Sequence, residues 1–200
     1  MPGPGVNILT DALPESVRIG ADTVAIATDF RAGLRVILAF EDPELTDIEK
    51  QMILLRVMYG ETEITDTEAA AHVAVKFLDG GKRESADQGQ PSPRVMSWQI
   101  DQQLIYAAFR QTHGIDLTTA TLHWWQFLAL FMDLGADTAF CQLAAQRQRL
   151  KDGSANKDEK KAAAKNPGLY YLPEPDHHTN SQRQTADEFL RLVKANEERG

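Results

Sequence analysis

The sequence predicts a mainly α protein, a helical bundle of about six to seven helices with a short N-terminal β-hairpin. Apolar residues recur at three- and four-residue spacing through most of the chain, which is the period of a helix with one buried face. Capping residues and glycines bound these stretches. With 200 residues, 42% of them hydrophobic and 25% charged, the chain has a globular composition and enough length to bury a sizeable core.

The hairpin is predicted from two β-branched segments near the N-terminus. SVRI (16–19) and TVAIA (23–27) flank a three-residue stretch that begins with Gly20, an arrangement typical of a tight hairpin. Two strands alone are marginally stable. We therefore expect the hairpin to pack on another element.

The first helix is expected to begin after Thr28 or Asp29, either of which can cap it, and to run to about Phe40. Gly33 weakens this helix, so we expect either close packing or fraying there. Its predicted buried residues are Phe30, Leu34, Ile37 and Leu38.

Two further helices precede a polar loop. One starts at Thr46 or Asp47 and ends at Gly60 as its C-cap. The other opens at Asp66 and stops at the glycines 80–81. The apolar residues of the first of these repeat at helical spacing and are Ile48, Met52, Leu55 and Met58 or Tyr59.

Residues 82–93 carry two prolines and no periodicity, which indicates a solvated loop of the length found between subdomains. A helix is expected from Ser97 to about His113, where Gly114 ends it. Its predicted buried side comprises Ile100, Leu104, Ala107, Ala108 and Leu117.

The most apolar segment, TLHWWQFLALFMDLG (121–135), holds two adjacent tryptophans. We expect Thr118 or Thr119 to cap this helix and Gly135 to end it. Adjacent side chains on a helix diverge by about 100°, so Trp124 and Trp125 look onto different neighbours. The only polar stripe consists of His123, Gln126 and Asp133. Such a helix is either a central core helix or half core and half interface.

Asp137 is expected to start another helix that ends near residue 151. We predict a helical core domain over residues 1–150, and residues 151–180 as a polar linker or an exposed helix. Residues 181–200 are predicted to form an amphipathic helix that carries Phe189, Leu190 and Val193.

The net charge of −8 argues against a nucleic-acid or anionic-membrane partner, because phosphate binding needs clustered Lys and Arg. No apolar run approaches the roughly 20 residues of a transmembrane helix, and no signal peptide is evident. The single cysteine, Cys141, permits no internal disulfide; we expect a buried, inert thiol. These features favour a cytoplasmic protein.

No catalytic, cofactor-binding or metal-binding residues are predicted. No two histidines have the i, i+4 spacing of a helical zinc pair, and no phosphate-binding glycine loop or G-x-S-x-G occurs. We interpret the aspartates at predicted helix starts as caps; they are Asp29, Asp47, Asp66, Asp101, Asp116 and Asp137. Asp101 and Asp116 are the two that merit examination as a site.

Three stretches carry a family resemblance: VNILTDALPESVRIG…TDFR (6–31), DQQLIYAAFRQTHGIDL (101–117) and LHWWQFLALFMDLGADTAFCQLAAQR (122–147). Together they resemble the bacteriophage gene-product-fifteen family of tailed-phage and prophage proteins. LHWW and IYAAF are the specific blocks. His113 stands where the family pattern has Tyr, and residues 82–93 are longer and more polar than that pattern.

The resemblance implies a place among tail-morphogenesis genes beside the tape-measure protein, and a role as a non-enzymatic tail-assembly chaperone. A tape measure is a long helical chain whose apolar faces lack a partner until the tube forms, so it would aggregate unless shielded. A structural virion component, such as a minor tail or connector protein, is the alternative. An enzyme that uses Asp101 or Asp116 is a third hypothesis.

The expected partner is therefore a protein, either the tape measure or another tail protein, and a homo-oligomer is compatible with the sequence. We expect aromatic and apolar side chains to bind it, and the competing interpretation places the aromatic ones in the core. The residues predicted to bind the partner are Trp98, Trp124, Trp125, Phe127, Phe131, Phe189 and Leu190.

Overall fold

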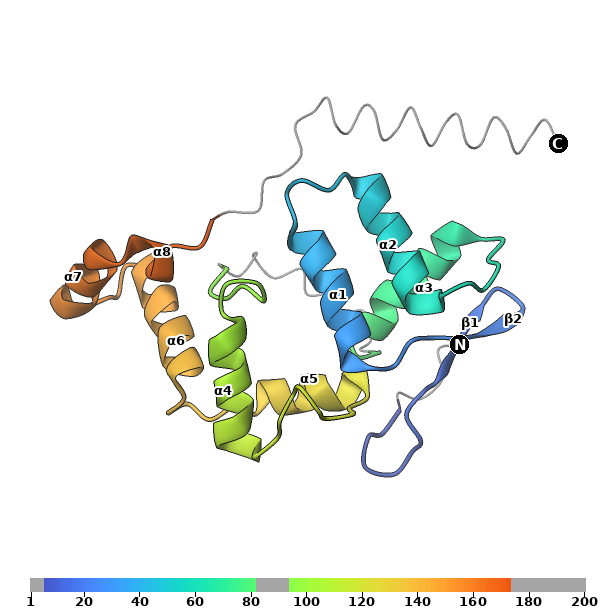
Figure 1. Ribbon diagram of the computed structural model, residues 1–200, viewed down its shortest axis with the longest axis horizontal. Helices are drawn as coiled ribbons and strands as arrows, with labels where there is room; N and C mark the ends of the chain where they lie inside the picture. Colours follow the sequence, from blue (N-terminus) through green and yellow to red (C-terminus); the bar gives the residue numbers. More distant parts are fainter. Residues whose placement is uncertain (1–5, 82–93, 174–200) are drawn as a thin grey trace. The chain divides into compact units, whose positions relative to one another are not determined.

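The computed structural model describes residues 6–81 and 94–173. Within them the chain forms eight helices and one two-stranded hairpin (Figure 1), which confirms the predicted mainly α class. The chain divides into two compact units. Unit 1 takes the described residues of Met1–Leu13 and Leu78–Glu174, and unit 2 those of Pro14–Phe77. The predicted domain boundaries at residues 150 and 180 stay predictions.

Unit 2 begins with the predicted hairpin. Strand β1 (Ser16–Ile19) pairs antiparallel with β2 (Asp22–Ala25). Gly20 takes a φ of 59° in the turn, a conformation that glycine adopts without strain. Ala27 N, two residues beyond β2, donates to Met58 O of the helix that ends at Tyr59, at 2.8 Å. Ile19 of β1 is buried, which supports the expectation that the hairpin packs on another element.

Three helices complete unit 2: α1 (Phe30–Glu41), α2 (Asp47–Tyr59) and α3 (Thr67–Leu78). Asp29 caps α1 by accepting from Arg31 N at 2.8 Å. Thr46 and Glu49 form a reciprocal capping box at the start of α2. The predicted starts of both helices are confirmed, and α1 packs against α2.

The predicted buried faces of α1 and α2 are partly wrong. Leu34, Ile37 and Leu38 are half-buried, whereas α1 buries Phe30, Ala32, Gly33 and Val36. On α2, Met52 is 63% exposed, and the buried residues are Lys50, Leu54, Met58 and Tyr59. A run such as MILL offers apolar side chains to more than one face, so packing rather than periodicity selects the buried one. The burial of Gly33 favours close packing over fraying.

Unit 1 contains five helices: α4 (Gln102–His113), α5 (Trp124–Met132), α6 (Ala139–Lys151), α7 (Lys157–Lys165) and α8 (Pro167–Tyr170). Helix α4 packs beside α6 and contacts α5, and α6 also contacts α7 and α8 (Figure 1). Residues 157–165 are thus helical, and Arg149 Nη2 of α6 binds Glu159 Oε1 of α7 at 2.5 Å.

The predicted start of α4 at Ser97 is wrong, because residues 97–101 form a turn and the helix begins at Gln102. The predicted buried side of this helix is also partly wrong, although Ala108 is buried as predicted. Ile100 is 45% exposed and Ala107 is exposed, whereas the residues that α4 buries are Ile105, Ala108 and Phe109. Helix α6 is capped by Thr138 and not by Asp137, since Thr138 Oγ1 accepts from Cys141 N.

The boundaries predicted for the tryptophan helix are also wrong. Helix α5 is capped by His123, which forms a capping box with Gln126, and it ends at Met132 with Asp133 as C-cap. The three polar residues that looked like a stripe therefore satisfy the two ends of a short helix. The predicted C-terminal helix, with Phe189 and Leu190, and the predicted loop over 82–93 lie outside the described residues.

Candidate functional site

Aromatic rings from α4, α5 and the turn before α4 meet in unit 1, with Phe127 at their centre. Phe127 is fully buried. Its ring stacks on those of Phe109 at 5.1 Å and Trp124 at 5.6 Å between centroids. The rings of Trp98 and Phe131 also lie near Phe127, with centroids 6.0 and 6.3 Å from its own. Such ring contacts stabilise a core beyond the area that they bury.

Trp124 and Phe127, both predicted to bind a partner, lie inside unit 1. Trp124 is 1% exposed, and its Nε1 donates to Leu78 O at 2.7 Å. The indole nitrogen therefore has an acceptor within the chain, as a buried indole requires. Neither side chain is placed to contact another molecule while unit 1 is folded.

Trp125 points to a different neighbour, as the helical wheel predicts. Its ring is half-buried and packs on Gly81, where an added Cβ would lie 2.8 Å from Trp125 Cη2. His123 contacts the same ring edge-on at 5.9 Å. At least part of the surface that the Trp125 ring contacts therefore belongs to this chain.

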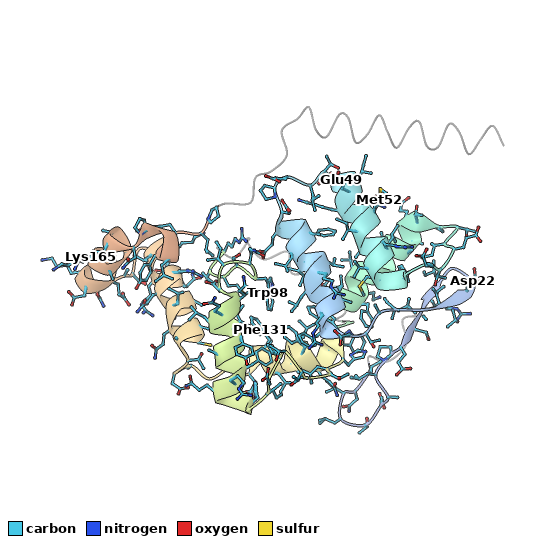
Figure 2. All side chains as sticks on the ribbon, viewed as in Figure 1. Asp22, Glu49, Met52, Trp98, Phe131 and Lys165 are labelled. Carbon is cyan, nitrogen blue, oxygen red and sulfur yellow. The ribbon has the colours of Figure 1, made fainter. Side chains whose placement is uncertain are left out.

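Trp98 and Phe131 form the accessible edge of the cluster. Their ring centroids are 4.7 Å apart (Figure 2), and both side chains are half-buried. In the sequence, Ile100 lies two residues after Trp98 and Met132 directly follows Phe131, and these two residues are 45% and 78% exposed. We name Trp98, Ile100, Phe131 and Met132 the Trp98 surface. It combines half-buried aromatic rings with exposed aliphatic side chains, a composition that suits a protein partner.

A buried ion pair supports this surface. Arg147 of α6 and Asp101, the residue before α4, are both about 1% exposed in their side chains. Arg147 Nη1 donates to Asp101 Oδ2 at 2.6 Å, and Nη2 donates to Asp101 Oδ1 at 2.9 Å. This is the bidentate geometry in which a guanidinium binds a carboxylate most strongly.

All five N–H groups of Arg147 have acceptors. Nε and Nη2 donate to Leu169 O at 2.9 and 2.6 Å, and Nη1 also donates to Val95 O at 3.1 Å. The other two bonds go to Asp101. Asp101 Oδ2 in turn accepts from Ser97 N at 2.9 Å. The pair thus fixes residues 95–101, the turn that carries Trp98.

Sequence reasoning missed Arg147 as a structural centre. Its signal was its place on the buried face of α6, since Phe140, Leu143 and Arg147 stand at i, i+3 and i+7 and are all buried. A charged residue on an apolar stripe predicts a buried partner. Asp101 stands at the N-cap position of α4 as predicted, but its side chain makes no cap hydrogen bond and pairs with Arg147 instead.

Asp116 lies beyond the other end of α4 and organises a surface turn. It accepts from Thr118 N at 2.9 Å, from Thr118 Oγ1 at 2.6 Å and from Tyr106 Oη at 3.2 Å. The Thr118 hydrogen bonds lower the pKa of Asp116, with smaller contributions from Tyr106 and Arg110. The 12 residues of α4 span about 18 Å. Asp101 and Asp116 therefore do not converge on one site.

Of the four other aspartates predicted to cap helices, the structure confirms two. Asp29 and Asp66 cap helices as predicted, Asp66 by accepting from Ala69 N at 2.9 Å. Asp47 lies in the first turn of α2, and Asp137 accepts from Gln111 Nε2 at 3.0 Å.

The thiol of Cys141 is half-buried rather than buried, and it contacts Leu134 O at 3.6 Å. In the part of the chain that the structure describes, no three His, Cys, Asp or Glu side chains gather as they would around a metal ion. None of the helices in residues 6–81 and 94–173 is long and apolar enough to cross a bilayer.

Comparison with known proteins identifies a family. The family model described as "Bacteriophage Gp15 protein" matches residues 9–172. No curated protein and no solved structure matches the chain. The matched stretch contains the Trp98 surface and the Asp101–Arg147 pair, and it confirms the family resemblance.

Proposed function

We propose, on the premise that this chain belongs to the bacteriophage Gp15 family, that it is a tail-assembly chaperone for the tape-measure protein. Membership makes it a phage structural or morphogenesis protein; the chaperone role is the finer proposal. The observation that carries it is the Trp98 surface. There, two half-buried aromatic rings contact each other, and the residue that follows Phe131 in the sequence is a methionine that is 78% exposed.

This surface has the properties needed to cover an apolar helix. Tryptophan and phenylalanine supply large contact areas with few rotatable bonds, and methionine adapts to irregular partners. A tape-measure helix would lay its apolar face on such a surface, in the manner of helix-in-groove recognition. The surface rests on a buried stack of rings and a fully bonded arginine, so little of it has to be ordered on binding.

We further propose that the protein is not an enzyme. Shielding apolar faces requires association and release, and neither step requires a proton transfer or a cofactor. The two aspartates considered as catalytic candidates have structural roles, since Asp101 pairs with Arg147 and Asp116 accepts hydrogen bonds within a surface turn. A chaperone of this kind would act in the cytoplasm of the bacterial host, before the tail is complete.

The proposal is tested by co-expressing the chain with the tape-measure protein of the same phage. We expect the wild-type chain to raise the soluble fraction of the tape measure and to co-elute with it in size-exclusion chromatography. Met132→Lys places a charge on the Trp98 surface and should abolish both effects. Met52→Lys changes another exposed methionine, on α2 (Figure 2), which is 63% exposed against 78% for Met132, and is the matched control.

The proposal fails if the tape measure is equally soluble without the chain and no complex elutes. It also fails if Met52→Lys and Met132→Lys behave alike. Mass spectrometry of purified virions distinguishes a chaperone from a structural virion component. A chaperone should be absent from mature particles, whereas a minor tail or connector protein should be present at fixed stoichiometry.

A further inference from the structure

Arg147 bonds to two segments that lie far apart in the sequence. The first is the turn of residues 95–101, which carries Trp98 and supplies Val95 O and the Asp101 carboxylate. The second is α8, which supplies Leu169 O to two of the five donors. A single buried side chain therefore holds both segments at once.

A second bond joins the same two segments. Arg94 Nη1 donates to Pro173 O at 3.2 Å, so the chain after α8 is attached to the residue before the turn. Leu172 is 7% exposed and anchors this end in unit 1, whereas Leu169 and Tyr171 are 42% and 53% exposed. Residues 167–173 thus combine one buried anchor with two accessible apolar side chains.

We infer that residues 167–173 act as a latch on the Trp98 surface, through Arg147. When the latch leaves, two N–H groups of a buried cation lose their acceptor. Unsatisfied buried donors are strongly unfavourable, so Arg147 must move or admit water. Its bonds to Val95 and Asp101 then loosen, and the turn that positions Trp98 loses its support. Leu169 and Tyr171 leave apolar surface accessible on the latch itself.

The inference rests on the proposed function where it concerns a partner, and it supplies the missing release step. A partner that orders the Trp98 turn must also strengthen the latch, because coupling between two sites is reciprocal. Conversely, any change that frees Leu169 O from Arg147 weakens the hold on that partner. Release then needs no competition for the Trp98 surface itself.

Amide hydrogen exchange on the full chain tests the latch without any partner. Leu172→Ala removes the anchor, and it should speed exchange at least tenfold at Leu169 and Tyr171 and also at Ser97 and Asp101. Leu169→Ala is the matched control: it truncates an exposed leucine but keeps the carbonyl that Arg147 binds, and exchange at residues 97–101 should stay within twofold of wild type.

Faster exchange at residues 169–171 with unchanged exchange at residues 97–101 would overturn the inference. If Leu172→Ala does not change exchange at residues 169–171, Leu172→Asp is used in its place. Faster exchange at residues 97–101 in that variant supports the latch, and unchanged exchange there overturns it. Arg147→Lys provides an independent test, because an ammonium has three donors in place of five. Both segments should then loosen together, while α2 in unit 2 stays protected. Uniform loosening of all of unit 1 would indicate general destabilisation and count against a latch.

The partner assay is read separately. Leu172→Ala should weaken binding of a tape-measure fragment at least fivefold, and Leu169→Ala should leave it within twofold of wild type. If the wild-type chain binds no tape-measure fragment, the chaperone proposal fails, but the exchange experiment still decides the latch. If the fragment binds both variants equally, the latch does not control the Trp98 surface.

Discussion

Replacing Arg147 with methionine should destabilise unit 1 severely. If the charge of Asp101 is removed in the same variant, part of the lost stability should be restored. Methionine fills much of the volume of the arginine stem but leaves the Asp101 carboxylate buried without a counter-ion. Breaking a buried pair from one side costs about 3–5 kcal/mol. In the double variant Asp101→Asn/Arg147→Met no charge remains, and the asparagine oxygen can still accept from Ser97 N.

The double variant should therefore be more stable than Arg147→Met alone, by about 2 kcal/mol, because it avoids the unpaired charge. Independent contributions would instead make two changes cost more than one. The orphaned carbonyls of Val95 and Leu169 are common to both variants and cancel in the comparison.

Tryptophan fluorescence during urea unfolding measures these differences for the relevant unit. The chain has three tryptophans, and Trp98, Trp124 and Trp125 all belong to unit 1. The transition midpoint and slope give the free energy of unfolding of each variant. The reasoning is refuted if Arg147→Met costs less than about 1 kcal/mol, or if the double variant is less stable than Arg147→Met.

Three other predictions follow from the packing. Trp124→Ala should cost about 3–5 kcal/mol and Trp125→Ala clearly less, since the second ring is half-buried; equal losses in urea unfolding would contradict this assignment. Gly81→Ala should destabilise more than Gly20→Ala. Both have positive φ, and a left-handed alanine costs about 1–2 kcal/mol, but only at Gly81 does the new Cβ meet a ring; equal shifts in melting temperature would be inconsistent with that contact. Burial raises the pKa of Tyr59 to about 12, against about 10 when unfolded. The stability that the neutral Tyr59 hydroxyl contributes is fully present below pH 10, and up to about 3 kcal/mol of it is lost as pH rises toward 12. A Tyr59→Phe variant should show a shallower decline in circular-dichroism unfolding over that range, and parallel declines would exclude this origin.

The features that sequence predicted well are those with a local cause. The hairpin follows from β-branched segments around Gly20, and the starts of α1 and α2 follow from Asp29 and Thr46, whose cap bonds reach only two or three residues. The start of α5 was missed because His123, a less common cap, replaced the threonines that propensity favours.

The features that sequence could not predict depend on contacts between distant residues. Arg147 and Asp101 are 46 residues apart, and nothing local distinguishes Arg147 from Arg149 except its place on the buried face of α6. The division of the aromatic residues into core and surface has the same origin. Periodicity placed Trp124 and Phe131 on one apolar helix, but only packing leaves Phe131 at the edge and Trp124 inside.

The donor set of Arg147 also constrains how this sequence can diverge. Val95 and Leu169 offer main-chain carbonyls, which any residue at those positions would provide, so the bonds to Arg147 do not constrain the residue type there. Among the residues that the structure describes, Asp101 is the only side-chain acceptor that the guanidinium binds, and a variant that keeps only one of the two charges buries it without a partner. Positions 101 and 147 are therefore expected to covary among relatives, changing together or not at all, while the residues between them diverge.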